Sequence, residues 1–182
     1  RGAGSTMGLA PLGKPTMDLS AFLSARSRSD YSIHDHGIEE VFGHLRRYWG
    51  GPLEPAHTAL AASAQRALED TVIQFIRDGL AGRPADNLCL AGGVALNCAM
   101  NQRIRTELGV KRIYVQPGAN DAGTSLGAAL EAHYDITGEA VPFEMDHAYL
   151  GPGYSDTEIE SVLKTWGLPY ERVDDIATEV AQ

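Results

Sequence analysis

The chain lacks the features that mark several broad classes of protein. No lysine- or arginine-rich run occurs and the net charge is −9, which argues against nonspecific nucleic-acid binding. No apolar run approaches the roughly 20 residues of a membrane helix. Only two cysteines occur, Cys89 and Cys98, and we expect both to be buried as small apolar residues rather than to form a disulfide or a metal site. Nucleic acid and membranes are therefore not expected partners, and we expect a cytoplasmic location.

What is present is ordinary for a folded protein. The 182 residues are 43% hydrophobic and 21% charged, which fits one domain or one domain plus a fragment. The chain begins with Arg1 rather than Met, and it stops at Gln182 soon after a helix is predicted to begin at Asp174. We therefore expect it to be part of a longer protein.

The most informative segment is residues 87–97 (NLCLAGGVALN), which predicts a buried strand, a glycine turn and a helix. Gly92 and Gly93 remove two side chains where the backbone must turn and where another group can approach it closely. Asn97 is expected in the first turn of the helix. A helix N-terminus behind such a turn suits phosphate or adenylate groups, although a tight turn without a ligand is the competing interpretation.

A second segment repeats this order. Residues 113–116 (IYVQ) predict a strand, a Pro-Gly turn follows, and Asp121 precedes a helix expected over 124–134. Strand and helix alternate with short turns, so we predict an α/β fold with parallel strands and right-handed crossovers. The two strand ends then form a crevice at the carboxyl edge of the sheet. For Asp121 taken alone, a helix N-cap is the competing interpretation to metal ligation.

The remaining segments predict structural elements and no catalytic or ligand-binding residue. A long amphipathic helix is expected after Pro52 and Pro55, and Gly79 and Gly82, followed by Pro84, are expected to stop it. A glycine- and proline-rich loop is expected over 7–15, and a polar surface excursion over 24–36. His34 and His36 lie in that excursion, where a surface loop is favoured over a metal cluster. Near the end, we expect a Ser155–Glu158 capping box, a helix, and a strand over 170–173.

Several motifs together resemble one known family. Residues 7–11 (MGLAP), 88–97 (LCLAGGVALN), 116–123 (QPGANDAG) and 126–130 (LGAAL) are similar to the NodU/CmcH carbamoyltransferases, which modify nodulation factors and antibiotics. The resemblance implies that residues 1–147 are the second half of a duplicated actin/sugar-kinase-like (ribonuclease H-like) ATPase domain. It implies that residues 148–182 are a linker and the start of a YrdC-like region.

The resemblance also implies a reaction. Carbamoyl phosphate and ATP give carbamoyladenylate, from which the carbamoyl group passes to a hydroxyl of a natural product or sugar. Gly92, Gly93 and Asn97 would hold the adenylate. Asp121 would ligate a divalent metal, expected to be iron or zinc, with Mg²⁺ accompanying ATP. No other catalytic residue is assigned.

The family's HxxxH metal ligands and most of its YrdC-like region do not occur in this sequence. We therefore expect the isolated chain to be inactive, to need the missing parts of its own full-length chain, and to be able to self-associate. A sugar-kinase-like phosphotransferase and a noncatalytic nucleotide-binding module are the alternatives. The loop over 7–11 disfavours the kinase.

Overall fold

The computed structural model describes residues 3–27, 30–34, 36–48, 50–142, 145 and 147–181. It divides the chain into two compact units, Arg1–Phe143 and Glu144–Gln182, which are described separately below. The predicted division after residue 147 concerns the domains of a longer protein, and it stays a prediction.

Helix α3 (Pro55–Leu80) is the long support of the first unit. A capping box fixes its start, because the His57 Nδ1 atom accepts a hydrogen bond from the Glu54 N–H at 2.9 Å and the Glu54 side chain accepts one from the backbone of His57. The helix ends at Leu80, between Gly79 and Gly82, which confirms the predicted stop. One helical glycine costs only about 1 kcal/mol, and the chain turns at Ala81 and Gly82, which both have positive φ.

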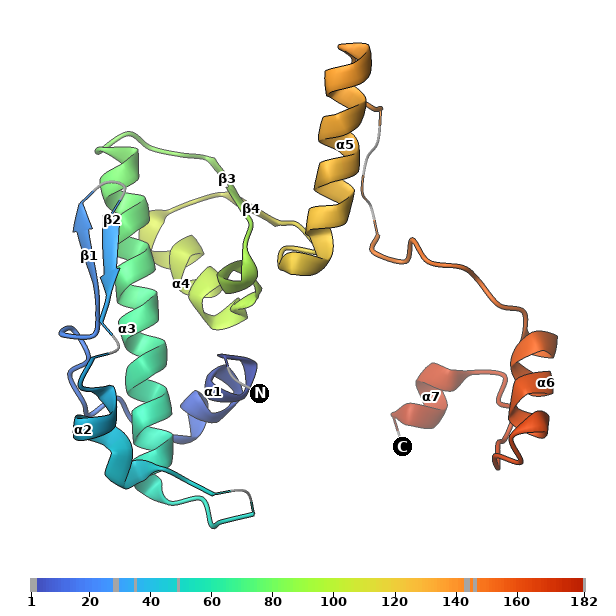
Figure 1. Ribbon diagram of the computed structural model, residues 1–182, viewed down its shortest axis with the longest axis horizontal. Coiled ribbons are helices and arrows are strands. Elements are labelled where there is room, and N and C mark those ends of the chain that lie inside the picture. The colour runs from blue at the N-terminus through green and yellow to red at the C-terminus, as the bar shows by residue number, and fades with distance from the viewer. Residues whose placement is uncertain are drawn as a thin grey trace. The chain divides into compact units, whose positions relative to one another are not determined.

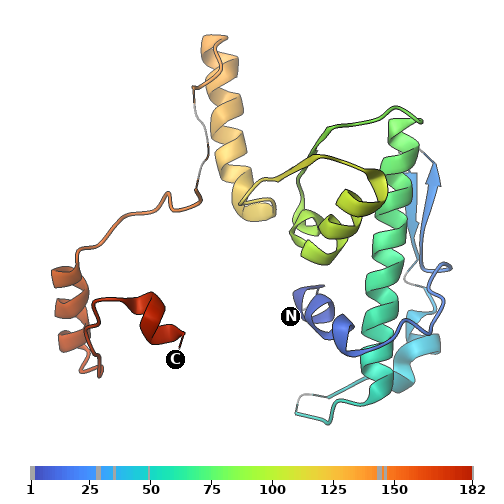
Figure 2. The same cartoon turned by 180° about the vertical axis from the view of Figure 1, so that it is seen from behind.

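Elements from the first 45 residues pack on two sides of α3. The β1–β2 hairpin lies along one side and α1 along the other, as Figure 1 and Figure 2 show. These elements, with the short helices beside them, are α1 (Ala3–Leu9), η1 (Ala10–Leu12), β1 (Leu23–Ser27), β2 (Asp30–Ile33), α2 (Ile38–Phe42) and η2 (Gly43–Leu45).

One sequence-based expectation for this region was wrong, because residues 7–12 are helical rather than a loop. Pro11 did not break the helical segment because it occupies one of the first positions of η1, where its missing N–H costs no hydrogen bond. Gly13 follows η1, and a Cβ atom there would overlap the backbone of Thr58 in α3. Most of the predicted polar surface excursion over 24–36 is an antiparallel hairpin. His34 and His36 are exposed after the hairpin, and Asp35 lies outside the described residues.

The second half of the first unit has the predicted alternation. Its elements are β3 (Asn87–Leu90), η3 (Gly93–Leu96), α4 (Cys98–Leu108), β4 (Arg112–Val115), η4 (Asp121–Gly123) and α5 (Thr124–Thr137). Strands β3 and β4 pair in parallel, with Leu88 opposite Ile113. This confirms the predicted strands, their parallel pairing and the mixed α/β character of the chain.

The core lies between α3, α4 and one face of the β3–β4 sheet. Ile73, Met100 and Ile104 are its buried centre. Partly buried side chains complete it: Val72, Ile76, Leu88, Leu90, Leu108 and Ile113.

Both cysteine predictions were wrong, because Cys89 and Cys98 are exposed. Successive side chains of a strand point to opposite faces, so Leu88 and Leu90 enter the core and Cys89 faces away from it. Its register partner Tyr114 is also exposed. Cys98 is the first residue of α4, where it lies outside the core.

The second unit holds α6 (Asp156–Thr165) and α7 (Ile176–Val180). The predicted capping box is confirmed, since the Ser155 hydroxyl accepts from the Glu158 N–H at 3.3 Å and Glu158 accepts from the Ser155 N–H at 2.7 Å. The predicted strand over 170–173 was wrong. Within the described part of this unit no strand is available to pair with it, and an unpaired strand leaves its backbone hydrogen bonds unmade.

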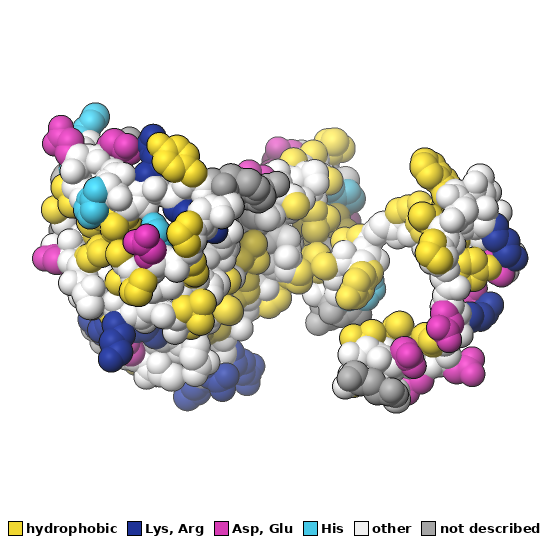
Figure 3. Space-filling model, turned by 90° about the horizontal axis from the view of Figure 1, so that it is seen from below, with side chains coloured by type: hydrophobic (Ala, Val, Ile, Leu, Met, Phe, Trp, Pro, Cys, Tyr) yellow, Lys and Arg dark blue, Asp and Glu magenta, His cyan; other side chains and the backbone are white. Residues whose placement is uncertain are grey.

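Apolar side chains remain on the surface of the second unit, where they are visible in Figure 3. Examples are Val162, Trp166 and Ile176, which are all more than half exposed. In both units, the described helices are too short or too polar to cross a membrane.

Candidate functional site

A cleft of about 460 Å³ opens where β3 and β4 end. The loops after the two strands and the start of α5 form its walls. Its lining includes Gly92, Gly93, Gly118, Asp121, Gly123 and Gly127. Because β3 and β4 are parallel, both loops emerge at the same edge of the sheet, which is where open α/β sheets bind ligands.

The two predicted glycines have different reasons to be glycine. Gly92 has φ 91° and ψ 160°, a conformation that other residues rarely adopt. Its N–H donates to the Ala119 carbonyl at 2.8 Å, so the two loops of the cleft are joined there. Gly93 does not have a positive φ, and a Cβ atom built on it meets no atom within 4 Å. Neither backbone conformation nor packing within the chain therefore explains Gly93, whereas a ligand lying against the backbone would.

Asp121 is the first residue of η4 and is exposed at the cleft. The N-cap of η4 is Asn120, whose Oδ1 atom accepts from the Ala122 N–H at 3.1 Å. The capping role proposed as the alternative for Asp121 thus belongs to its neighbour. The Asp121 carboxylate has no hydrogen bond or ion pair to any other described residue, which leaves both oxygens available to a cation.

A metal at this position would need ligands besides Asp121. A catalytic zinc site typically has three protein ligands. Among the described residues, no group of three or more His, Cys, Asp or Glu side chains is placed to bind one ion. Asp121 fits the role of one oxygen ligand in a shared site.

Asn97 does not line the cleft, and it follows the η3 turn that begins there. It is the N-cap of α4, and its Oδ1 atom accepts from the Met100 N–H at 3.0 Å. Its amide also pairs reciprocally with that of Gln65 on α3: Asn97 Nδ2 donates to Gln65 Oε1 at 2.9 Å, and Gln65 Nε2 donates to Asn97 Oδ1 at 3.0 Å. Both acceptor sites of Oδ1 are thus used, and one N–H remains for a ligand.

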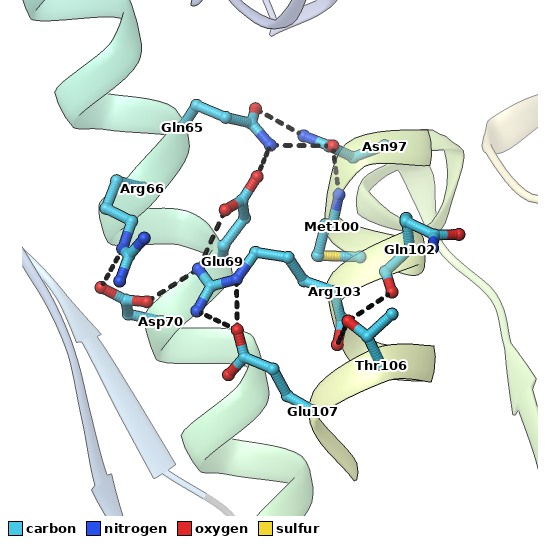
Figure 4. Close-up of polar contacts among 10 residues, drawn as sticks. All are labelled: Gln65, Arg66, Glu69, Asp70, Asn97, Met100, Gln102, Arg103, Thr106 and Glu107. Carbon is cyan, nitrogen blue, oxygen red and sulfur yellow. Dashed lines mark hydrogen bonds and ion pairs between the residues drawn. The ribbon is translucent and has the colours of Figure 1, made fainter. Parts of the chain in front are cut away.

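This amide pair is the end of a polar network between α3 and α4, shown in Figure 4. Gln65 Nε2 also donates to Glu69 Oε1 at 2.7 Å. Glu69 Oε2 then accepts from Arg103 Nη1 at 2.9 Å, and Arg103 further pairs with Asp70 and Glu107. The network crosses between the two helices beside the apolar core.

Burial and pairing act in opposite directions on Arg103. Burial by itself lowers the pKa of its guanidinium, but hydrogen bonds to Glu107, Glu69 and Asp70 outweigh that effect and raise the pKa above its ordinary value. The hydrogen bond from Arg103 in turn lowers the pKa of Glu107. Arg103 therefore stays charged and holds three carboxylates from two helices.

Of this network, only Asn97 was predicted from sequence, and Gln65, Glu69 and Arg103 were not. Gln65 and Glu69 are buried, whereas the apolar residues Leu60, Leu68 and Val72 of the same helix are only half-buried. The available signal was a row spaced by four residues, from Ala61 through Gln65 and Glu69 to Ile73. Polar residues inside an otherwise apolar row indicate a buried network rather than a solvated face.

Comparisons with known proteins place this site in context. A family model described as "Carbamoyltransferase N-terminus" matches residues 1–130. The chain is 37% identical to nodulation protein NolNO of Sinorhizobium fredii, over 97% of this chain and 27% of that protein. It is 35% identical to nodulation protein NolO of Bradyrhizobium diazoefficiens, over 96% of this chain and 33% of that protein.

A further relative is an uncharacterized protein of Synechocystis sp., which is 36% identical over 87% of this chain and 29% of its own length. The chain thus spans no more than about a third of the length of these curated relatives.

Proposed function

Because the chain belongs to the carbamoyltransferase family, we propose that it forms part of the site at which a carbamoyltransferase passes the carbamoyl group to a hydroxyl. The observation that carries this proposal is the meeting of Gly92, Gly93 and Asp121 in one cleft at the carboxyl edge of two parallel strands. The parallel pair with its crossover helix α4 is also compatible with half of a duplicated actin/sugar-kinase-like domain, which we include in the proposal.

The donor in this proposal is carbamoyladenylate, made elsewhere in the full-length protein from carbamoyl phosphate and ATP. The acceptor hydroxyl oxygen forms a bond to the carbamoyl carbon, and the bond from that carbon to the phosphate oxygen of AMP breaks. AMP leaves, and the hydroxyl proton passes to solvent. The products are a carbamate ester, AMP and a proton.

Each site residue then has a stated task. Gly93 lets the adenylate lie against the backbone, and Gly92 makes the turn that brings that backbone to the cleft. Asn97 offers its one remaining N–H to the ribose or base. Asp121 supplies one ligand to a divalent metal, iron or zinc, which when bound polarises the carbamoyl carbonyl as a Lewis acid.

The acceptor in this proposal is a sugar or natural-product hydroxyl, as the resemblance to the NodU/CmcH carbamoyltransferases implies. Its identity depends on loops and pocket shape rather than on the residues above. A cytoplasmic location stays a prediction.

The experiment uses the full-length protein that carries this chain, with carbamoyl phosphate labelled at carbon and ATP labelled at the γ-phosphate. We expect the carbon label to appear in a panel of hydroxyl acceptors and the phosphate label to stay out of them. Chelation should stop the transfer, and iron or zinc should restore it where Mg²⁺ alone does not. Transfer of the phosphate label to an acceptor would instead establish the kinase alternative. Binding of nucleotide with no transfer of either label would support a noncatalytic module.

A further inference from the structure

The polar network between α3 and α4 is directional, and its order fixes the orientation of Asn97. The Met100 N–H must point at an acceptor, so the Asn97 oxygen faces the α4 N-terminus and its nitrogen faces Gln65. The Glu69 carboxylate can only accept, so the Gln65 nitrogen faces Glu69. The pair of amides is therefore oriented from both ends. The first turn of α4 orients Asn97, and the Glu69 carboxylate, which Arg103 holds, orients Gln65.

Burial makes this orientation costly to lose. Gln65 is 9% exposed and Glu69 is 7% exposed. A buried amide or carboxylate left without its partner loses the hydrogen bond and cannot replace it with water. In contrast, Gln74 on the same helix donates to Asp78 at 2.7 Å with the same four-residue spacing, but that pair is exposed.

The segment that the network holds is the one that turns at the cleft. Only η3 separates Gly92 from Asn97, and the Asn97 N–H closes that turn on the Val94 carbonyl at 3.0 Å. The turn is anchored at its start by the bond from Gly92 to Ala119 and at its end by the amide pair with Gln65. Gly93 lies between these two anchors.

We infer that Gln65 is a positioning residue for the nucleotide turn: it fixes Asn97, and Glu69 with Arg103 fixes Gln65. This inference rests on the proposed function, because it assigns the turn to nucleotide binding. Gln65 does not touch the nucleotide itself. It acts by keeping Asn97 and the Gly92–Gly93 segment in the conformation that binds.

The test compares Gln65→Met with Gln74→Met in the full-length protein. Methionine keeps the length and apolar stem of glutamine but makes none of its hydrogen bonds. Calorimetric titration with a nonhydrolysable ATP analogue measures affinity, and the reference signal is the binding event that Gly93→Val weakens. We expect Gln65→Met to weaken this binding about tenfold or more, the scale of leaving buried hydrogen-bonding groups unpaired, and Gln74→Met to leave it unchanged.

A second variant, Gln65→Glu, separates positioning from a general loss of stability. When ionised, the introduced carboxylate would face two acceptors, Asn97 Oδ1 and Glu69 Oε1, and could donate to neither. Protonation gives it one donor again. The affinity of this variant relative to the unmodified protein should therefore rise several-fold as the pH falls from 8 to 6. The other charged groups around this position are Arg66 and Asp70 on α3 and Arg103 and Glu107 on α4.

Three outcomes decide the inference. Weakened binding in Gln65→Met with the expected pH dependence in Gln65→Glu supports it. A lower melting temperature in Gln65→Met, with unchanged affinity below that temperature, overturns it and leaves Gln65 as a purely structural residue. Unchanged affinity in Gly93→Val overturns the proposed function, and with it this inference, whatever the Gln65 variants show.

Discussion

The β3–β4 sheet has one face covered by α3 and α4 and an opposite face on which Cys89 and Tyr114 lie in the open. On the covered side, Ile104 is fully buried, and Glu69 is held by Arg103. At the open end of the sheet, the Asp121 carboxylate has no partner among the described residues.

Parallel sheets are usually covered on both faces, so the open face and the exposed α5 differ from the common arrangement. The well-packed residues of this chain and the residues proposed to bind ligands therefore lie in different places. The covered side fixes the positions of the loops, while the groups proposed to meet ligands have few contacts of their own. Substitutions on the two sides should therefore have separable effects.

The largest effect is expected at the open end. Asp121→Ala in the full-length protein should lower carbamoyl transfer on the order of 10³-fold, because a Lewis-acid contribution of several kcal/mol is lost with a metal ligand. Formation of carbamoyladenylate, measured as carbamoyl-phosphate-dependent exchange of pyrophosphate into ATP, should continue. Asp135→Ala, an exposed aspartate on α5, is the matched control and should transfer normally. Normal transfer by Asp121→Ala would remove Asp121 from the site.

The next effect is expected on the covered side and concerns stability. Ile104 is 0% exposed, and truncating a buried isoleucine to alanine costs about 2–5 kcal/mol of unfolding free energy. Ile104→Ala should show this loss in urea unfolding, and below its melting temperature its nucleotide affinity should stay within a fewfold of normal. Ile136→Ala, on the 84% exposed Ile136 of α5, should leave stability nearly unchanged in this chain. Equal losses from the two variants would contradict the described core.

A third substitution lies where the two regions meet. Gly93→Val should weaken nucleotide binding roughly ten- to a hundredfold, the equivalent of the 1–3 kcal/mol that overpacking costs. Because a Cβ atom at Gly93 meets nothing within 4 Å in the chain itself, the melting temperature should barely change. Gly92→Val, in contrast, should destabilise the protein, since φ is 91° there. Calorimetric titration and thermal unfolding together test both variants, and Gly153→Val is the control outside the cleft.

The smallest effect concerns the second unit. Ser155→Ala removes the cap of α6 and should cost about 1 kcal/mol of helix stability. Hydrogen bonds from the Ser155 backbone N–H and hydroxyl lower the pKa of Glu158. A carboxyl group whose pKa is lowered by folding stabilises the folded state at a pH above its pKa in the unfolded state. This contribution is lost as the pH falls through its pKa in the folded state.

The protection of the amides at the start of α6, measured as exchange rate relative to the intrinsic rate at each pH, should therefore fall on acidification below about pH 4.5, the ordinary pKa range of Glu. This loss of protection should be smaller in Ser155→Ala. An acid response of the same size in both proteins would show that the capping box does not cause it.

The strand–turn–helix of the site was predictable from sequence because its signals are local. An apolar run, paired glycines and a following helical pattern are enough to predict β3, the turn and α4. The fold of the first 45 residues was less predictable, because it depends on packing against α3, as at Gly13, where a Cβ atom would overlap the backbone of Thr58. That contact joins residues far apart in the chain.

The polar network was missed for the same reason. A glutamine and a glutamate four residues apart on a helix normally indicate a solvated pair, as Gln74 and Asp78 are. Gln65 and Glu69 are instead paired with Asn97 and Arg103, which lie more than 30 residues later in the chain. The role assigned to Asn97 also changes, from an amide free to bind a ligand to one already used in three directions.

The central claim is that the glycine turn and Asp121 form one transfer site. A crystal structure of the full-length protein with its metal and a nonhydrolysable carbamoyladenylate analogue tests it most directly. We predict that the adenylate lies against Gly92 and Gly93 and that Asp121 is a ligand of the metal, identified by its anomalous scattering. An adenylate and metal bound together elsewhere, with the cleft between the two loops empty, would contradict the account.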